Sequence, residues 1–147
     1  MWRARKGVVE TGVRMPHELH VIKAGDFIRS GPQGELDFET SRQILKALAE
    51  ALLTRGIDKA VLDLRKTQMN PPASYTQLYH LARAFQEAGY CPRHRLAVLI
   101  SPDRYDKAEF FAICASGRGW NTYAFDDFED AFDWLTDEER IETSNAV

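Results

Sequence analysis

The chain has 147 residues, of which 44% are hydrophobic, and its formal net charge is -3. This length suits one compact domain, and the apolar fraction argues against wholesale disorder and against collagen-like or coiled-coil repeats. No apolar run approaches the ~20 residues that a membrane-spanning helix needs, and the basic N-terminus lacks the apolar segment of a secretory signal. Two cysteines are too few for a disulfide framework. We therefore expect a soluble domain of the cytoplasm.

The charge is distributed unevenly along the chain. Between Asp126 and Glu142 there are nine acidic residues and one arginine, so the preceding part is mildly basic. The acidic end suits a solvated helix face or a surface for a protein partner. The candidates for a basic patch, which would meet an acidic protein or anionic lipid heads, are Arg93, His94, Arg95, Arg104, Lys107 and Arg118. With a pI near 5.8, the chain is not expected to bind nucleic acid.

The first elements follow a basic N-terminal segment. Residues 1–17 carry no periodic apolar face and are expected to be a flexible leader. Two short runs of strand-forming residues, 18–23 and 26–31, predict a hairpin. A helix is expected over 39–55, because its apolar side chains fall on one face and Gly56 follows as a typical C′ glycine.

The middle of the chain predicts a buried strand and a second helix. The apolar run Ala60–Leu64, interrupted only by Asp63, is typical of a central parallel strand. Two prolines in the loop 65–73 exclude a helix before Ser74. The spacing of Ser74 and Gln77 is that of a capping box, which predicts a helix to Ala88.

The last part of the chain alternates in the same way. It predicts strands over 96–100 and 121–125, a helix over 102–116 and a last helix from Phe128. Ser101 is the expected N-cap of the third helix, with proline at its first position. Asp126 or Asp127 is the expected cap of the last, and the tail 137–147 is polar.

These elements give the order β-β-α-β-α-β-α-β-α. Alternation of strands and helices implies right-handed crossovers and a mainly parallel sheet. The sequence therefore predicts one α/β domain over 18–136, with a four- to five-stranded, mainly parallel sheet and an antiparallel N-terminal hairpin.

Four segments in this order also carry a resemblance to a known family. They are Phe27-Ile28-Arg29 with Gly34–Asp37, Val61–Arg65, Arg95–Leu99, and Gly119–Phe125 followed by Phe128–Ala131 and Trp134-Leu135. Over 18–136 the chain resembles the SpoIIAA-like branch of the STAS superfamily, known from bacteria. The resemblance implies a non-enzymatic module that binds a regulatory kinase. It also implies a switch by phosphorylation of a serine at the start of the helix after the central strand.

The resemblance also implies where a partner would bind. The family's D-S-S-G block is absent here, and Ser74 is the only serine in that place. The loop 65–73 and the start of the following helix are the expected contact surface. The candidate partner-binding or phosphoacceptor residues are Ser74, Tyr75, Tyr79, Met69 and Asp63. For Ser74 the role of helix cap is the alternative.

A small apolar ligand is the second hypothesis for the function. Aromatic residues make up 11% of the chain. The related CRAL-TRIO lipid-transfer domains use the same general architecture to enclose apolar ligands, so a pocket between helices and sheet would hold a lipid-like molecule. A well-filled core explains the same aromatic residues. A homodimer through helix faces also stays open.

Catalysis is the least favoured reading of the sequence. His17, His20, His80 and His94 show no metal-ligand spacing with Cys91 or Cys114. Asp63, Asp103 and Asp126 follow strands, where carboxylates can hold Mg²⁺, but helix capping explains the last two. No nucleophile or acid–base constellation is visible. We therefore expect no enzyme, no metal and no cofactor.

Overall fold

A five-stranded sheet forms the centre of the part of the chain that the structure, a computed structural model, describes: residues 19–22, 27–88, 94–116 and 121–136. Its strands, in spatial order, are β1 (Leu19–Ile22), β2 (Phe27–Ser30), β4 (Lys59–Asp63), β6 (Arg95–Leu99) and β7 (Asn121–Phe125). β1 pairs antiparallel with β2, and every other neighbouring pair is parallel. The mainly parallel sheet with an antiparallel N-terminal hairpin is therefore confirmed.

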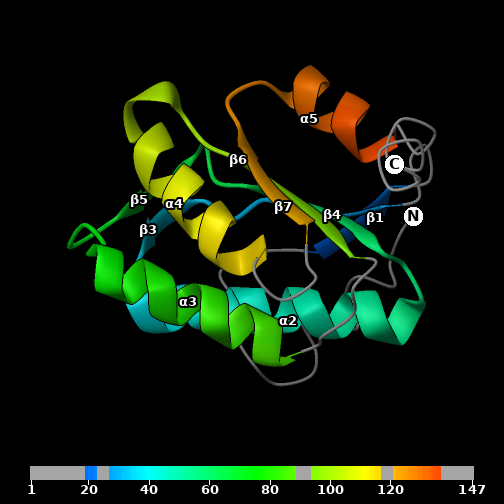
Figure 1. Cartoon of the computed structure of the whole chain (residues 1–147), viewed down its shortest axis with the longest axis horizontal. Helices are drawn as coiled ribbons and strands as arrows, with labels where there is room; N and C mark the ends of the chain where they lie inside the picture. Colours follow the sequence, from blue (N-terminus) through cyan, green and yellow to red (C-terminus); the bar gives the residue numbers. More distant parts are fainter. Residues whose placement is uncertain (1–18, 23–26, 89–93, 117–120, 137–147) are drawn as a thin grey trace.

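Helices cover the sheet on both faces (Figure 1). They are α2 (Phe38–Arg55), α3 (Tyr75–Ala88), α4 (Tyr105–Ala115) and α5 (Phe128–Thr136). Because side chains alternate along a strand, Leu62 and Val98 pack with α2, α3 and α4, while Val61 and Leu99 pack with α5. Both central strands are buried along their whole length, as their continuous apolar runs predicted.

Local signals determine where α2 begins and ends. The Asp37 carboxylate accepts a hydrogen bond from the backbone N–H of Thr40 at 2.8 Å, which caps the first turn. Gly56 ends the helix with φ of 65°, in the left-handed region that favours glycine. The helix predicted over 39–55 is thus confirmed to within one residue.

The predicted loop 65–73 is wrong in one respect, because it contains a strand. β5 (Thr67–Met69) pairs parallel with β3 (Gly34–Leu36), and the two form a separate small sheet. The loop carries no alternating apolar pattern that would have predicted a strand. Its backbone groups instead find partners on another equally short segment.

The predicted start of the third helix is also wrong. The chain forms a 3-10 turn, η1 (Pro102–Arg104), and α4 begins only at Tyr105. The Ser101 hydroxyl does not cap the helix, because it accepts hydrogen bonds from Nε and Nη2 of Arg104, at 3.3 and 3.2 Å.

The remaining predicted boundaries have mixed outcomes. The strand 121–125 is confirmed, and Asp127 is the cap of α5, where its carboxylate accepts from the Asp130 N–H. The predicted leader 1–17 and tail 137–147 lie outside the described residues, as does Cys91.

Candidate functional site

An apolar pocket of about 370 Å³ lies on the three-helix side of the sheet. Its inner walls come from β4, β6 and helices α2, α3 and α4; Leu45, Leu62, Leu81, Val98 and Phe111 are among its lining residues. The small sheet contributes Leu36 and Met69. The helices and the small sheet thus leave a space between them that is partly open to solvent.

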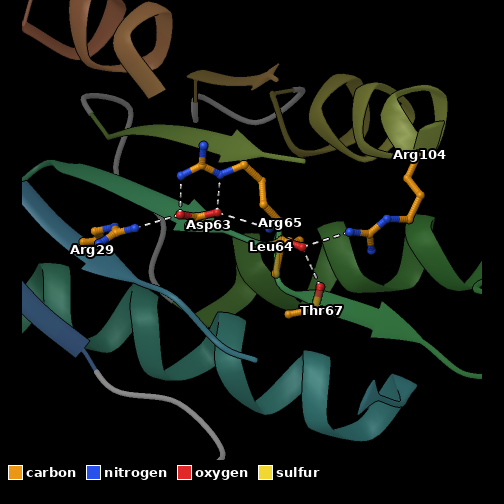
Figure 2. A network of polar contacts seen from close by, with 6 residues as sticks. All are labelled: Arg29, Asp63, Leu64, Arg65, Thr67 and Arg104. Atoms are coloured by element: carbon orange, nitrogen blue, oxygen red, sulfur yellow. Dashed lines mark hydrogen bonds and ion pairs between the residues drawn. The ribbon is translucent and has the colours of Figure 1, made fainter. Parts of the chain in front are cut away.

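Two of the side chains that line the pocket are positively charged. Arg104 lies in η1, and its Nη2 donates to the backbone carbonyl of Leu64 at 3.0 Å (Figure 2). Lys107 lies one turn further on, in α4, and its Nζ donates to the carbonyl of Ala73. The same Nζ lies 5.2 Å from the ring centroid of Tyr75, a distance typical of a cation–π contact.

A second, more polar pocket adjoins the first. It has a volume of about 350 Å³ and shares Thr67, Gln68 and Arg104 with the apolar pocket. Its other lining residues are Gly34, Glu35, Arg65, Lys66, Ser101 and Asp103. The apolar pocket therefore opens beside a polar surface at the carboxyl end of the sheet, where ligands bind in many open α/β folds.

Ser74 forms the capping box that the sequence predicted. Its hydroxyl oxygen accepts from the backbone N–H of Gln77, and the Gln77 side-chain oxygen accepts from the N–H of Ser74, both at 3.1 Å. Ser74 is exposed, but its hydroxyl oxygen already satisfies a helix N–H.

The two candidate tyrosines lie on the exposed side of α3. Tyr75 is 50% exposed and Tyr79 is 44% exposed. The Tyr75 ring packs edge-on against Phe110, with ring centroids 4.9 Å apart. Arg83 Nη1 donates to the Tyr79 hydroxyl at 3.4 Å. Met69 lies nearby in the apolar pocket, and its sulfur accepts from the Ser41 hydroxyl at 3.6 Å.

Asp63 does not join the other candidates. As a neighbour of Leu62 on β4, it lies on the α5 side of the sheet. It accepts from Arg29 Nη2 at 2.7 Å and from Arg65 Nη2 at 2.8 Å (Figure 2). Burial alone would raise the pKa of Asp63, but the hydrogen bonds from Arg65 and Arg29 lower it to about 2. The carboxylate thus joins three segments, β2, β4 and the chain after β4.

The histidine, cysteine and basic candidates lie in different parts of the structure. His80 is exposed on α3, whereas His94 is buried at the opposite end of β6 from Arg104 and Lys107. Within the predicted basic patch, Arg104 and Lys107 therefore lie apart from His94. Arg93 and Arg118 lie outside the described residues. Burial raises the pKa of the half-buried Cys114 thiol.

Two general features of the described part of the chain bear on the class of protein. Its His, Cys, Asp and Glu side chains nowhere gather in a group of three or more that could hold a metal ion. None of its helices has both the length and the apolar character needed to cross a membrane.

The sequence predicts a pocket between helices and sheet as one alternative, but it identifies neither the residues that line the pocket nor the two cations beside it. Arg104 was assigned only to a basic patch, and the 3-10 turn that brings it to the Leu64 carbonyl was not predicted. The signals for a pocket are the number of aromatic residues and the likeness to lipid-transfer domains. A filled core explains the aromatic residues equally well, and among the lining residues the one aromatic side chain is Phe111.

Comparison with known proteins bears on the fold. No family model and no curated protein matches the chain. Among solved structures, it is similar to an uncharacterized DUF3478-family protein with a SpoIIAA-like fold from Shewanella loihica. The identity is 21%, the TM-score is 0.50, and the match covers 81% of this chain and 91% of that one.

A further solved structure is the unphosphorylated anti-sigma factor antagonist SpoIIAA, at 15% identity and a TM-score of 0.45, with 89% of this chain and 99% of that chain covered. The match to the Shewanella protein, together with the strand order and parallel pairing, confirms the fold that the sequence resemblance implied. The described chain is a domain of the SpoIIAA-like fold.

Proposed function

We propose that this domain is a non-enzymatic binding module whose ligand is a small, largely apolar molecule held between α2, α3, α4 and the sheet. The observation that carries the proposal is the apolar pocket of about 370 Å³. Its volume lies within the roughly 300–1,000 Å³ range of small-molecule sites. The unfilled space favours a ligand pocket over a filled core, although Phe111 is the one aromatic residue among those that line it.

A pocket-filling variant tests this function. Ala108 lines the pocket from α4, so Ala108→Phe fills part of it. The matched control is Ile113→Phe on the same helix, because Ile113 is 67% exposed. Binding is measured by displacement of the neutral fluorescent probe N-phenylnaphthylamine by decanol.

We expect decanol to bind the wild type and Ile113→Phe, and to raise their melting temperatures, because a ligand that binds only the folded state stabilises it. Ala108→Phe should bind at least about tenfold more weakly, since the filled volume excludes part of the chain. The proposal is wrong if decanol does not bind the wild type, or binds Ala108→Phe equally well.

The exposed aromatic side chains on α3 favour a second candidate function, binding of a protein partner. Tyr75 and Tyr79 lie four residues apart and so share one side of the helix. Tyrosine is enriched among the residues that contribute most to protein interfaces. Tyr75 directly follows Ser74 and Tyr79 lies one turn further along α3, at the place where the family resemblance implies partner binding.

Affinity purification from the cells that make the protein tests the second candidate. The bait proteins are the wild type, the double variant Tyr75→Ala with Tyr79→Ala, and Tyr123→Ala as control. Tyr123 is 54% exposed but lies on β7, where it stacks on Trp134. A partner bound at α3 is retained by the control and lost by the double variant. Equal recovery from all three baits rejects α3 as the contact surface.

A further inference from the structure

We propose that the apolar pocket takes a single-chain amphipathic acid, whose anionic head group binds Arg104 and Lys107 while its hydrocarbon chain fills the pocket. This inference rests on the proposed small-molecule function and assigns the class of ligand.

The charges at the pocket are of one sign. Among its lining residues, the charged side chains are Arg104 and Lys107, and none is a carboxylate. Neither cation forms an ion pair within the described part of the chain. By contrast, Arg29 and Arg65, on the other face of the sheet, both bind the Asp63 carboxylate. Two half-buried cations without a carboxylate, beside an apolar wall, favour an anion.

Both cations retain donors for a head group. An ammonium group has three N–H donors, and the Ala73 carbonyl occupies one of those of Lys107. The guanidinium of Arg104 uses Nε and Nη2 on the Ser101 hydroxyl, and Nη2 also on the Leu64 carbonyl. Figure 2 shows the contact with Leu64. Its Nη1 makes no hydrogen bond to the described residues. These existing contacts hold both cations in place without using all their donors.

The position of the cations also fits a ligand with two unlike ends. Arg104, the last residue of η1, and Lys107, in the first turn of α4, are three residues apart and lie toward the same side. Arg104 lines both the apolar and the polar pocket, so it lies where the two meet. A hydrocarbon chain in the apolar pocket would therefore place its head at the polar side. The polar pocket is lined by charges of both signs: the carboxylates of Glu35 and Asp103, and the cations of Arg65 and Lys66. The preference for an anionic ligand therefore depends on the two cations that line the apolar pocket.

Competition at neutral pH between ligands that share one chain length tests the inference. Decanoate, decanol and decyltrimethylammonium are each titrated, below their micelle concentrations, against N-phenylnaphthylamine. We expect decanoate to bind at least about tenfold more tightly than decanol, because a charged hydrogen bond contributes that much or more. Decyltrimethylammonium should bind most weakly.

Variants assign this preference to the cation in α4. Lys107→Met should bring the ratio of the decanol and decanoate dissociation constants toward one, whereas Lys107→Arg should retain it. Lys46→Met is the matched control, because Lys46 is exposed on α2 and does not line the pocket. The same ratio measured in each folded variant separates head-group recognition from a general loss of binding.

The outcomes distinguish the two proposals. Three results would overturn the proposal of an anionic head group but not that of an apolar ligand. They are equal binding of decanol and decanoate, tight binding of decyltrimethylammonium, and an unchanged ratio of dissociation constants in Lys107→Met. Failure of all three compounds to displace the probe overturns both the inference and the small-molecule function.

Discussion

Asp63 shows most clearly how one side chain contributes to stability. Two arginines bind its carboxylate, and its pKa falls from 3.8 to about 2. A carboxyl group whose pKa is lower in the folded state stabilises the fold above its unfolded pKa. This contribution is lost as the pH falls through the folded pKa.

We expect Asp63→Asn to lower the free energy of unfolding at neutral pH by about 2 kcal/mol, because two guanidinium groups lose a charged partner. The difference from the wild type should shrink as the pH falls from about 4 to about 2, the interval between the two pKa values of Asp63. Urea unfolding at a series of pH values measures it.

The control is Glu39→Gln, which removes an exposed carboxylate paired with Arg42 at 2.6 Å. Exposed pairs contribute little, so this variant should unfold almost as the wild type does. A pH-independent effect of Asp63→Asn would contradict the assignment.

The sequence identified Asp63 as unusual, because it interrupts an apolar strand, but not its partners. Arg29 lies 34 residues earlier and meets Asp63 only because β2 and β4 are adjacent in the sheet. Spacing along the chain carries no information about such a contact.

At the scale of an element, Ser74 gives α3 a defined start. We expect Ser74→Ala to destabilise the protein by about 1 kcal/mol, the usual effect of losing an N-cap oxygen. Ser74→Asp should leave stability nearly unchanged, since aspartate caps equally well and favours the positive end of the helix. Thermal unfolding followed by circular dichroism measures both variants.

The neighbouring exposed Thr76, within the first turn, gives the control Thr76→Ala, for which we expect little change in stability. If Ser74→Ala and Thr76→Ala unfold alike, the capping box does not contribute to the stability of α3.

Helix ends that depend on residues within one turn can be predicted from the sequence, whereas elements that depend on distant contacts cannot. The capping box and Gly56 act within one helical turn, so the ends of α2 and the start of α3 could be inferred. β3 and β5 have only three residues each, and each is a strand only because the other lies beside it. The start of α4 was misjudged because a tertiary contact, Arg104 with the Leu64 carbonyl, accompanies a 3-10 turn there.

At the scale of the whole molecule, the two faces of the sheet differ in the number of helices that pack on them. α2, α3 and α4 share one large cluster of buried side chains, whereas α5 packs on the other face with Phe27, Val61, Ala97 and Leu99. Arg95 Nη1 also donates to the carbonyls of Trp134 and Leu135 at the end of α5, at 3.3 and 3.0 Å.

We expect the backbone amides of α5 to exchange with solvent at a lower opening free energy than those of α3, because a helix with fewer neighbours opens locally. Hydrogen exchange followed by mass spectrometry measures this difference. Leu135→Ala, which removes a fully buried side chain of α5, should accelerate exchange in α5 and leave α3 unchanged. Equal protection of the two helices in the wild type would contradict the prediction.

The pocket also belongs to the scale of the whole molecule, which explains why the sequence suggests it only as an alternative and does not identify its walls. Its walls combine residues from the sheet, three helices and the small sheet, and the space is a property of their packing. The apolar pattern of each element is the same whether the neighbouring side chains meet or leave a gap.

The small sheet of β3 and β5 has a consequence for how such a domain can change. Leu36 and Met69 line the pocket from a pair of strands that lies outside the five-stranded sheet. Substitutions at these two positions would reshape the pocket without altering the register of the large sheet. Leu36 is a buried member of the core, whereas Met69 is only partly buried against it. We therefore expect Met69 to be the position of the small sheet at which the pocket can be reshaped with the smaller effect on folding.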